Sequence, residues 1–256
     1  MFIRPTECGL GQRITNLSIE FLPCGDTALA VQLGKGIDRQ LSNRVLSLHE
    51  RIRAAALPGV VESVPTFRSL LVHYDPLVTS SAALVKAVGD MIEDTGSAPR
   101  RARIWRIPVC YAPEFAPDMA DVSERSGLSP EQVAECHAAT RYHVYMIGFL
   151  PGFPYMGDVA PELVLPRRKD PRTRVPAGAI AIATNLTAIY TLESPGGWNL
   201  IGATPIRSFD ARWTPPALLA PGDGVLFSPI TAQEFGEIRA ASEAGNYKVV
   251  CEDAAP

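Results

Sequence analysis

The densest group of charged side chains in the sequence lies between Pro166 and Arg174. This nine-residue stretch holds five cations and one acid, although the chain as a whole carries a net charge of −3. Guanidinium groups bind carboxylates and phosphates through paired donors, so this segment is a candidate anion site. The alternative is a solvated surface loop, which is what most charge runs form.

A second unusual segment runs from Phe149 to Tyr155. It contains three aromatic residues, two prolines and one glycine in seven positions. Proline fixes φ and glycine frees it, so the composition predicts a defined loop rather than a helix or strand. Aromatic side chains on such a loop are suited to line a small-molecule pocket. Alternatively, the segment is a hydrophobic plug that closes the end of a barrel.

The third segment is Ser194–Trp198, which contains the pair Gly196 and Gly197. Paired glycines allow close approach of a ligand, and their exposed N–H groups can bind an anion. The alternative is a tight turn in which Trp198 anchors the core. All three segments fall within fifty residues, and a shared barrel mouth would bring them together into one site.

His137, in the helix before these segments, is the candidate acid or base, because an unperturbed histidine titrates near pH 6.5. A packed or surface histidine is the alternative. The four histidines are not paired at metal-ligand spacing, so no metal site is expected. The sequence also has no phosphate-binding loop of the G-x-x-x-x-G-K-[ST] type and no G-x-S-x-G nucleophile motif.

The composition is that of a globular protein, with 46% hydrophobic and 20% charged residues. The net charge gives no support for nucleic acid or an anionic membrane as a partner. Five scattered cysteines without a C-x-x-C pair favour a reducing compartment. With no apolar run of signal-peptide or membrane-span length, the expectation is a cytoplasmic protein.

The elements that position these residues fall into two groups. Hydrophobic periodicity predicts a first α+β domain over 17–96, preceded by a leader at 1–16. Its expected elements follow the order β-β-α-β-β-α, with strands at 19–23, 27–33, 60–64 and 67–74 and helices at 37–52 and 80–92. A polar linker at 95–103 leads to a second domain over 103–240.

The second domain is expected to begin with a strand at 104–111, followed by helices at 117–126 and 130–139. Ser129 and Gln132 form a capping-box signature for the second helix. A strand follows at 142–149. Short β-type runs joined by glycine and proline turns then predict a barrel or sandwich; they lie at 179–184, 188–192, 200–201 and 224–227.

Long motifs in the second half resemble a known family. They are H-x4-Y-x-V-Y-M-I-G-F-L-P-G-F-P-Y-M-G from 137 to 157, P-R-x4-R-x-R-V-P-A-G from 166 to 178, and I-Y-x3-S-P-G-G-W-N-L-I-G-x-T-P from 189 to 205. This set is similar to the family of 5-oxoprolinase B subunits, also called the KipI or allophanate hydrolase subunit 1 family. The resemblance implies an N-terminal α+β domain followed by a C-terminal cyclophilin-like β-barrel.

The resemblance also implies an activity and partners. Together with the A and C subunits of the same complex, such a chain would open 5-oxo-L-proline to L-glutamate with hydrolysis of ATP, which a partner would bind or share. The segments above would then form half of a site. His137 and Arg172 are the implied catalytic residues. The implied substrate-binding residues are Phe149, Phe153, Tyr155, Arg167, Arg174, Gly196, Gly197, Trp198 and Thr204.

Three positions depart from the family pattern. Ala203 stands where arginine is usual, Ala179 where serine is usual and Thr191 where proline is common. Two alternative functions stay open. One is a KipI-like inhibitor of a sensor histidine kinase, and the other is a carboxyltransferase component for a urea-like substrate that uses biotin from another chain.

Overall fold

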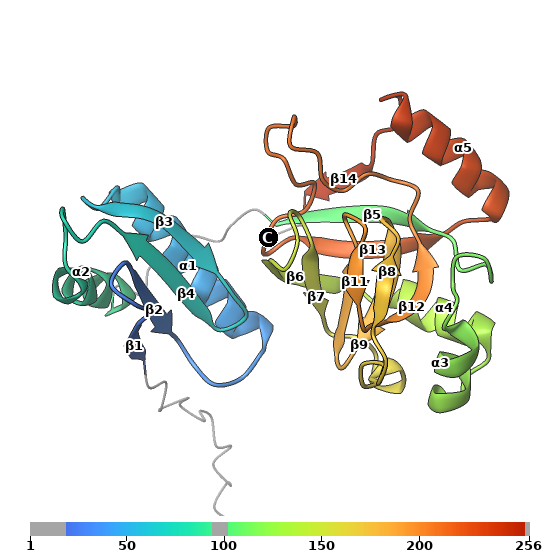
Figure 1. Cartoon of the computed structure of the whole chain (residues 1–256), viewed down its shortest axis with the longest axis horizontal. Helices are drawn as coiled ribbons and strands as arrows, with labels where there is room; N and C mark the ends of the chain where they lie inside the picture. Colours follow the sequence, from blue (N-terminus) through green and yellow to red (C-terminus); the bar gives the residue numbers. More distant parts are fainter. Residues whose placement is uncertain (1–18, 94–101, 254–256) are drawn as a thin grey trace, which may run out of the picture.

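The computed structural model describes residues 19–93 and 102–253, which Figure 1 shows as two bodies side by side. The predicted leader and most of the predicted linker lie outside the described residues. The mixture of helices and sheets confirms the α and β class that the sequence indicates. The boundaries 17–96 and 103–240 stay a prediction.

The first body is a four-stranded antiparallel sheet in the order β1-β2-β4-β3, with two helices packed against it. Its elements are β1 (Glu20–Pro23), β2 (Ala28–Gln32), α1 (Arg39–Ala55), β3 (Val60–Pro65), β4 (Ser69–Tyr74) and α2 (Ser81–Glu93). This is the predicted order. Alternate residues of β2 and β4 face the helices and are completely buried, as in Leu29, Val31, Leu70 and Val72.

Helix α1 begins two residues later than the periodicity suggests. The Asp38 carboxylate accepts a hydrogen bond from the Leu41 N–H at 2.8 Å and caps the helix, which leaves Ile37 outside it and 44% exposed. From Leu41 to Ile52 the apolar residues follow the helical period and pack on the sheet.

The second body is built on an eight-stranded sheet in the order β12-β9-β10-β7-β6-β13-β5-β14. Its strands are β5 (Arg103–Val109), β6 (Tyr142–Ile147), β7 (Pro154–Gly157), β9 (Ala179–Ala183), β10 (Leu186–Ile189), β12 (Asn199–Ala203), β13 (Gly224–Pro229) and β14 (Val250–Asp253). Neighbouring strands are antiparallel except β5 and β13, which are parallel. β14 lies beyond residue 240 and still pairs with β5.

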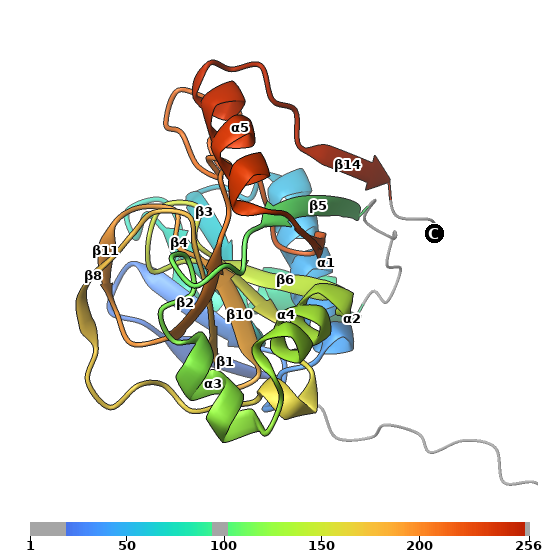
Figure 2. The ribbon, with the colours of Figure 1, turned by 90° about the vertical axis from the view of Figure 1, so that its right-hand side faces the viewer.

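The remaining elements surround this sheet. They are α3 (Met119–Ser126), α4 (Pro130–Ala139), the short 3-10 helix η1 (Pro161–Leu163), α5 (Ala232–Glu243) and a two-stranded sheet of β8 (Arg172–Val175) and β11 (Ser194–Gly196). The α3–α4 pair and α5 lie on opposite sides of the second body, with α5 at the top and α3–α4 at the bottom of Figure 2. Ser129 and Gln132 form the predicted capping box of α4.

The eight-stranded sheet curls until its edge strand β12 approaches β5, the strand next to the other edge strand β14. Cys110, just after β5, and Ala203, at the end of β12, form an isolated bridge with N···O distances of 2.9 and 3.0 Å. No continuous ladder joins β5 to β12 among the described residues. A closed cyclophilin-like barrel is therefore not confirmed, although side chains of β5 and β12 share one hydrophobic core.

Three strands occupy segments that the sequence predicts as loops or turns. Pro154 and Tyr155 begin β7, and proline is tolerated there because it stands at the first strand position. Arg172 and Arg174 lie on β8 rather than on a solvated loop, and Ser194–Gly196 is β11, its partner. These strands are only three or four residues long and contain proline or glycine, so strand propensity does not reveal them.

Side chains of α1 connect the first body to strands β6 and β7 of the second. The Ser42 hydroxyl lies 3.0 Å from His143 Nε2, and both residues are buried. Arg39 forms an ion pair with Asp158 and donates a hydrogen bond to the Arg141 carbonyl at 2.8 Å. These buried and charged contacts fix the position of α1 against the larger sheet. None of the helices in the described ranges has the length and apolar character needed to cross a membrane.

Candidate functional site

The three unusual segments meet around Trp198. Its ring lies 6.1 Å from the Phe153 ring and 5.9 Å from the Tyr155 ring, both in edge-on arrangements. The Arg167 guanidinium carbon lies 5.8 Å from the centre of the Trp198 ring. The aromatic, cationic and double-glycine segments are therefore neighbours, as the sequence predicts. Their predicted roles in binding substrate stay predictions.

These aromatic side chains differ in how much of their surface is exposed to solvent. Phe153 is 1% exposed and Trp198 is 5% exposed. Both side chains therefore belong to the hydrophobic core beneath the surface. Phe149 is 61% exposed, and Tyr155 is half-buried. Burial raises the pKa of the Tyr155 hydroxyl while Arg167 acts in the opposite direction, which keeps this phenol neutral at physiological pH.

The cationic segment is held in place by Asp118, a buried residue at the start of α3. Its carboxylate accepts hydrogen bonds from Arg168 at 2.6 Å and from both terminal nitrogens of Arg172, at 2.7 and 2.8 Å. It also accepts from the Leu200 N–H at 2.7 Å. Arg172 is therefore a positioning residue whose donors are directed at protein, and the predicted catalytic role is not supported by this geometry.

Arg174 is also paired, but at the surface. Two of its nitrogens donate to the two carboxylate oxygens of Glu193, at 3.0 and 2.7 Å, and both side chains are well exposed. Among the described residues, Arg167 and Lys169 are the cations of this segment without a carboxylate partner. These two side chains are the ones available to bind an anion.

His137 lies in the interior, is completely buried and lines neither of the two cavities described in this section. Its Nδ1 lies 2.7 Å from the Tyr111 hydroxyl and its Nε2 lies 2.9 Å from Thr187 Oγ1. Because Thr187 Oγ1 donates to the Ala181 carbonyl, it accepts from Nε2–H, and Nδ1 accepts from Tyr111. Burial lowers the pKa of His137 to about 3. A neutral imidazole with both nitrogens occupied argues against the predicted acid–base role.

The glycine pair has a packing role in this structure. A Cβ at Gly196 would collide with the Tyr190 hydroxyl, so only glycine fits beside this buried ring. The Gly197 carbonyl accepts a hydrogen bond from the Arg168 N–H at 2.8 Å. This contact anchors the cationic segment, and the anion site formed by the backbone N–H groups of the pair stays a prediction.

Thr204 lines a different and larger cavity, of about 760 Å³. The walls come from the start of β9, the segment after β12, and one face of α5. The Phe115 and Phe235 rings, with centroids 4.2 Å apart, attach α5 to the body beside this cavity. A space of this size is large enough for a metabolite.

One wall of the large cavity carries two arginines that share one carboxylate. Asp210 is buried and accepts from Arg207 at 2.7 Å and from two nitrogens of Arg212, at 2.9 and 2.6 Å. These arginines lower the pKa of Asp210 well below its usual range. The cluster carries one net positive charge, and both guanidinium groups remain largely exposed. No prediction from the sequence covered this cluster, whose visible signal is the R-x-x-D-x-R spacing.

The three departures from the family pattern all line this large cavity. Ala179 and Ala203 leave its floor without the serine and arginine expected there. Thr191 adds a hydroxyl, which donates to the Pro151 carbonyl at 2.7 Å and ties the aromatic loop to the wall. Within the described ranges, no group of three or more histidine, cysteine, aspartate or glutamate side chains could hold a metal ion.

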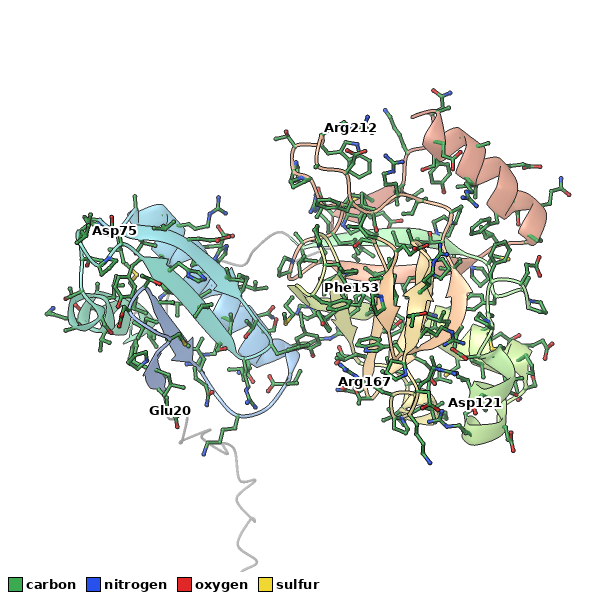
Figure 3. All side chains as sticks on the ribbon, in the orientation of Figure 1. Glu20, Asp75, Asp121, Phe153, Arg167 and Arg212 are labelled. Carbon is green, nitrogen blue, oxygen red and sulfur yellow. The ribbon has the colours of Figure 1, made fainter. Side chains whose placement is uncertain are left out.

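Figure 3 shows that the two regions lie apart. Arg212 marks the loop beside the large cavity, whereas Arg167 and Asp121 lie toward the opposite end of the eight-stranded sheet, with Phe153 between them. A second, smaller cavity of about 530 Å³ opens beside Arg167 and Asp121. Thr204 and Arg167 therefore do not belong to one pocket.

The chain is similar to a family model and to curated proteins. Residues 19–219 match the family model described as carboxyltransferase domain, subdomain C and D. The chain is 36% identical over 225 residues to the 5-oxoprolinase B subunit of Bacillus subtilis (strain 168), covering 82% of this chain and 92% of the relative.

Two solved structures are similar. The crystal structure of TTHA0988 aligns with a TM-score of 0.71 and 38% identity over 80% of this chain, which spans 40% of that longer chain. The Kluyveromyces lactis urea amidolyase aligns with a TM-score of 0.78 over 96% of this chain and 17% of its own. At 21% identity, that likeness shows a common fold.

Proposed function

This chain belongs to the family of carboxyltransferase domains, subdomain C and D, and we propose that it is the B subunit of an ATP-dependent 5-oxoprolinase that opens 5-oxo-L-proline to L-glutamate. The observation that carries the proposal is the 36% identity to a 5-oxoprolinase B subunit over 82% of this chain and 92% of the relative. A hydrolase made of several subunits is what this name implies for the relative.

The chain acts with partners, the C and A subunits of the same complex, in a hetero-oligomer. The sequence lacks a phosphate-binding loop, which supports nucleotide recognition by a partner rather than by this chain alone. The scattered cysteines of the described ranges are unpaired thiols, in keeping with a cytoplasmic complex. We also infer that the curled eight-stranded sheet is a variant of the cyclophilin-like barrel, which the bridge at Cys110 supports.

We place the cyclic amide in the large cavity beside Thr204. 5-Oxoproline is a small planar lactam with one carboxylate, so its site needs an apolar wall, a cationic anchor and polar groups for the amide. Phe235 supplies an apolar wall, and the positive Arg207–Asp210–Arg212 cluster supplies the anchor. The Thr204 hydroxyl supplies a polar group for the amide. It is adjacent in the sequence to Ala203, where the family pattern has arginine.

The reaction places charge on the amide oxygen as the ring opens. Groups positioned before the reaction stabilise such charge more effectively than water does, because they need no reorganisation. Asp210 holds both guanidinium groups in fixed positions, so the cluster is already arranged when substrate enters. We infer that the nucleophile and the base come from a partner subunit, so that the cavity is half of a complete site.

The proposal is tested by producing the chain together with its partner A and C subunits and measuring ATP-dependent release of glutamate. Arg212→Ala should lower kcat/KM by roughly tenfold or more, the usual cost of removing a charged hydrogen-bond donor. Lys86→Ala, on the exposed face of α2, is the control and should leave the activity unchanged. Absence of activity with partners that work alongside another B subunit would overturn the proposal.

The fold shared with urea amidolyase makes carboxyl transfer the second candidate. It predicts biotin-dependent carboxylation of a urea-like substrate, with biotin carried by another chain. Testing the reconstituted complex with carboxybiotin and with 5-oxoproline in parallel separates the two activities. Inhibition of a histidine kinase stays a prediction, which an autophosphorylation assay with the purified chain tests.

A further inference from the structure

The smaller cavity has a charge pattern distinct from that of the large one. Four cations and two acids line it, together with Pro166: Arg125, Arg167, Arg168 and Lys169 oppose Asp121 and Asp170. The surplus of two positive charges lies in a chain whose net charge is −3. This pocket therefore concentrates positive potential on an otherwise acidic protein.

Two of the four cations already form ion pairs with carboxylates of this chain. Arg125 pairs with Asp121 at 2.9 Å, and Arg168 pairs with Asp118 at 2.6 Å. Arg167 and Lys169 have no carboxylate within ion-pair distance among the described residues, and both are exposed. They are the two charges that a ligand in this cavity would meet.

Arg167 is arranged in advance for an anion. Its guanidinium lies over the ring of Trp198, which is itself buried against Phe153. A cation–π contact of this kind uses none of the N–H donors, so these donors can still bind the paired oxygens of a phosphoryl group or a carboxylate. The contact also reduces the rotamer entropy that binding would otherwise remove.

The backbone that carries Arg167 and Lys169 is fixed from several sides. The Pro166 carbonyl accepts from Asn199 Nδ2 at 3.1 Å, and the Arg168 N–H donates to the Gly197 carbonyl at 2.8 Å. The Arg168 side chain is anchored to buried Asp118. A cationic segment tied at three points differs from a solvated loop, because its charges stay in one place without a ligand.

We propose that this cavity binds a phosphoryl group, with Arg167 and Lys169 as its ligands and Trp198 as the support of Arg167. A dianion is favoured over a carboxylate, because Arg167 and Lys169 both line the cavity without a carboxylate partner among the described residues and their attraction grows with the charge of the ligand. The group is either free phosphate or the tail of a nucleotide. The site is separate from the large cavity, and it stands whether or not the chain takes part in 5-oxoproline hydrolysis.

The contact between Arg167 and the Trp198 indole provides a direct readout. Titration of the purified chain with inorganic phosphate at constant ionic strength should change the Trp198 fluorescence in a saturable manner, and Trp198→Phe should remove the change. Arg167→Gln should weaken binding by tenfold or more, which is the usual effect of losing a charged hydrogen bond. Arg174→Gln is the matched control, because it removes an equal charge from a surface ion pair nearby and should alter affinity less than twofold.

Competition between ATP and inorganic phosphate shows whether the bound phosphoryl group belongs to a nucleotide or to free phosphate. ATP binding more tightly than phosphate assigns the site to a nucleotide tail, whereas equal affinities assign it to a phosphoryl group alone. 5-Oxoproline at the same ionic strength should not displace phosphate. The proposal is overturned if Arg167→Gln binds phosphate as the natural chain does, or if Arg174→Gln weakens binding as much as Arg167→Gln.

Discussion

The buried histidine in α4 allows a quantitative test of stability against pH. We consider His137→Gln, because a glutamine amide can still donate to Thr187 and accept from Tyr111 but does not titrate. In the folded chain the imidazole is fully buried and its pKa is lowered to about 3. In the unfolded chain a histidine pKa is about 6.5. The unfolded state therefore binds one more proton than the folded state between these two values.

The sign and size of the effect follow from this difference. Because the folded pKa is the lower one, stability is lost as pH falls below about 6.5, and the loss stops growing near pH 3. Between pH 7.5 and 5.0 the histidine alone should lower the free energy of unfolding by about 2 kcal/mol, at 1.36 kcal/mol for each pH unit below 6.5. His137→Gln should lack this component.

Urea unfolding at the two pH values measures the difference. The natural chain should lose about 2 kcal/mol more than His137→Gln on acidification. Tyr111→Phe is the control, because it removes one hydrogen bond but keeps the buried imidazole, so its pH dependence should follow that of the natural chain. Equal losses in the natural chain and in His137→Gln would show that His137 is not a buried neutral group, and its acid–base role would then return.

Three further changes test the packing around the two cavities. Asp118→Asn leaves two arginines uncompensated and should lower the unfolding free energy by about 3 kcal/mol, against less than about 1 kcal/mol for Asp121→Asn in an exposed pair. Gly196→Ala should cost about 1–3 kcal/mol by colliding with the Tyr190 hydroxyl, as urea melts can show. Phe235→Ala should speed amide exchange across α5 while the sheet is unaffected.

The regular elements were predictable because a single periodicity determined each of them. Helix α1 follows from apolar residues at helical spacing, and α4 from the Ser129–Gln132 pair that its termini need. α5 escaped prediction although Thr231 and Glu234 form the same kind of capping box. Its buried face consists of Phe235, which is too narrow a stripe to give a periodic signal.

The sequence indicated that the three segments of the candidate site lie together, but it did not indicate which carboxylates pair with its arginines. The composition of three segments correctly indicated that they lie together, because Arg167, Trp198 and Phe153 are neighbours. The composition did not indicate which of the cations form ion pairs with carboxylates of the same chain. Asp118 lies about fifty residues before its partners Arg168 and Arg172, and such a distant carboxylate leaves no local pattern.

The parallel pair of β5 and β13 has a consequence for synthesis. Ile104 on β5 lies opposite Gly224 on β13, so 120 residues must leave the ribosome before the pair can form. At roughly 5–20 residues per second, this delay lasts about 6–24 s. During that time β5 presents Trp105, Ile107 and Val109 without the neighbours that later bury them. A nascent chain stopped near residue 220 would therefore expose an unpaired apolar strand, the kind of edge that chaperones must shield.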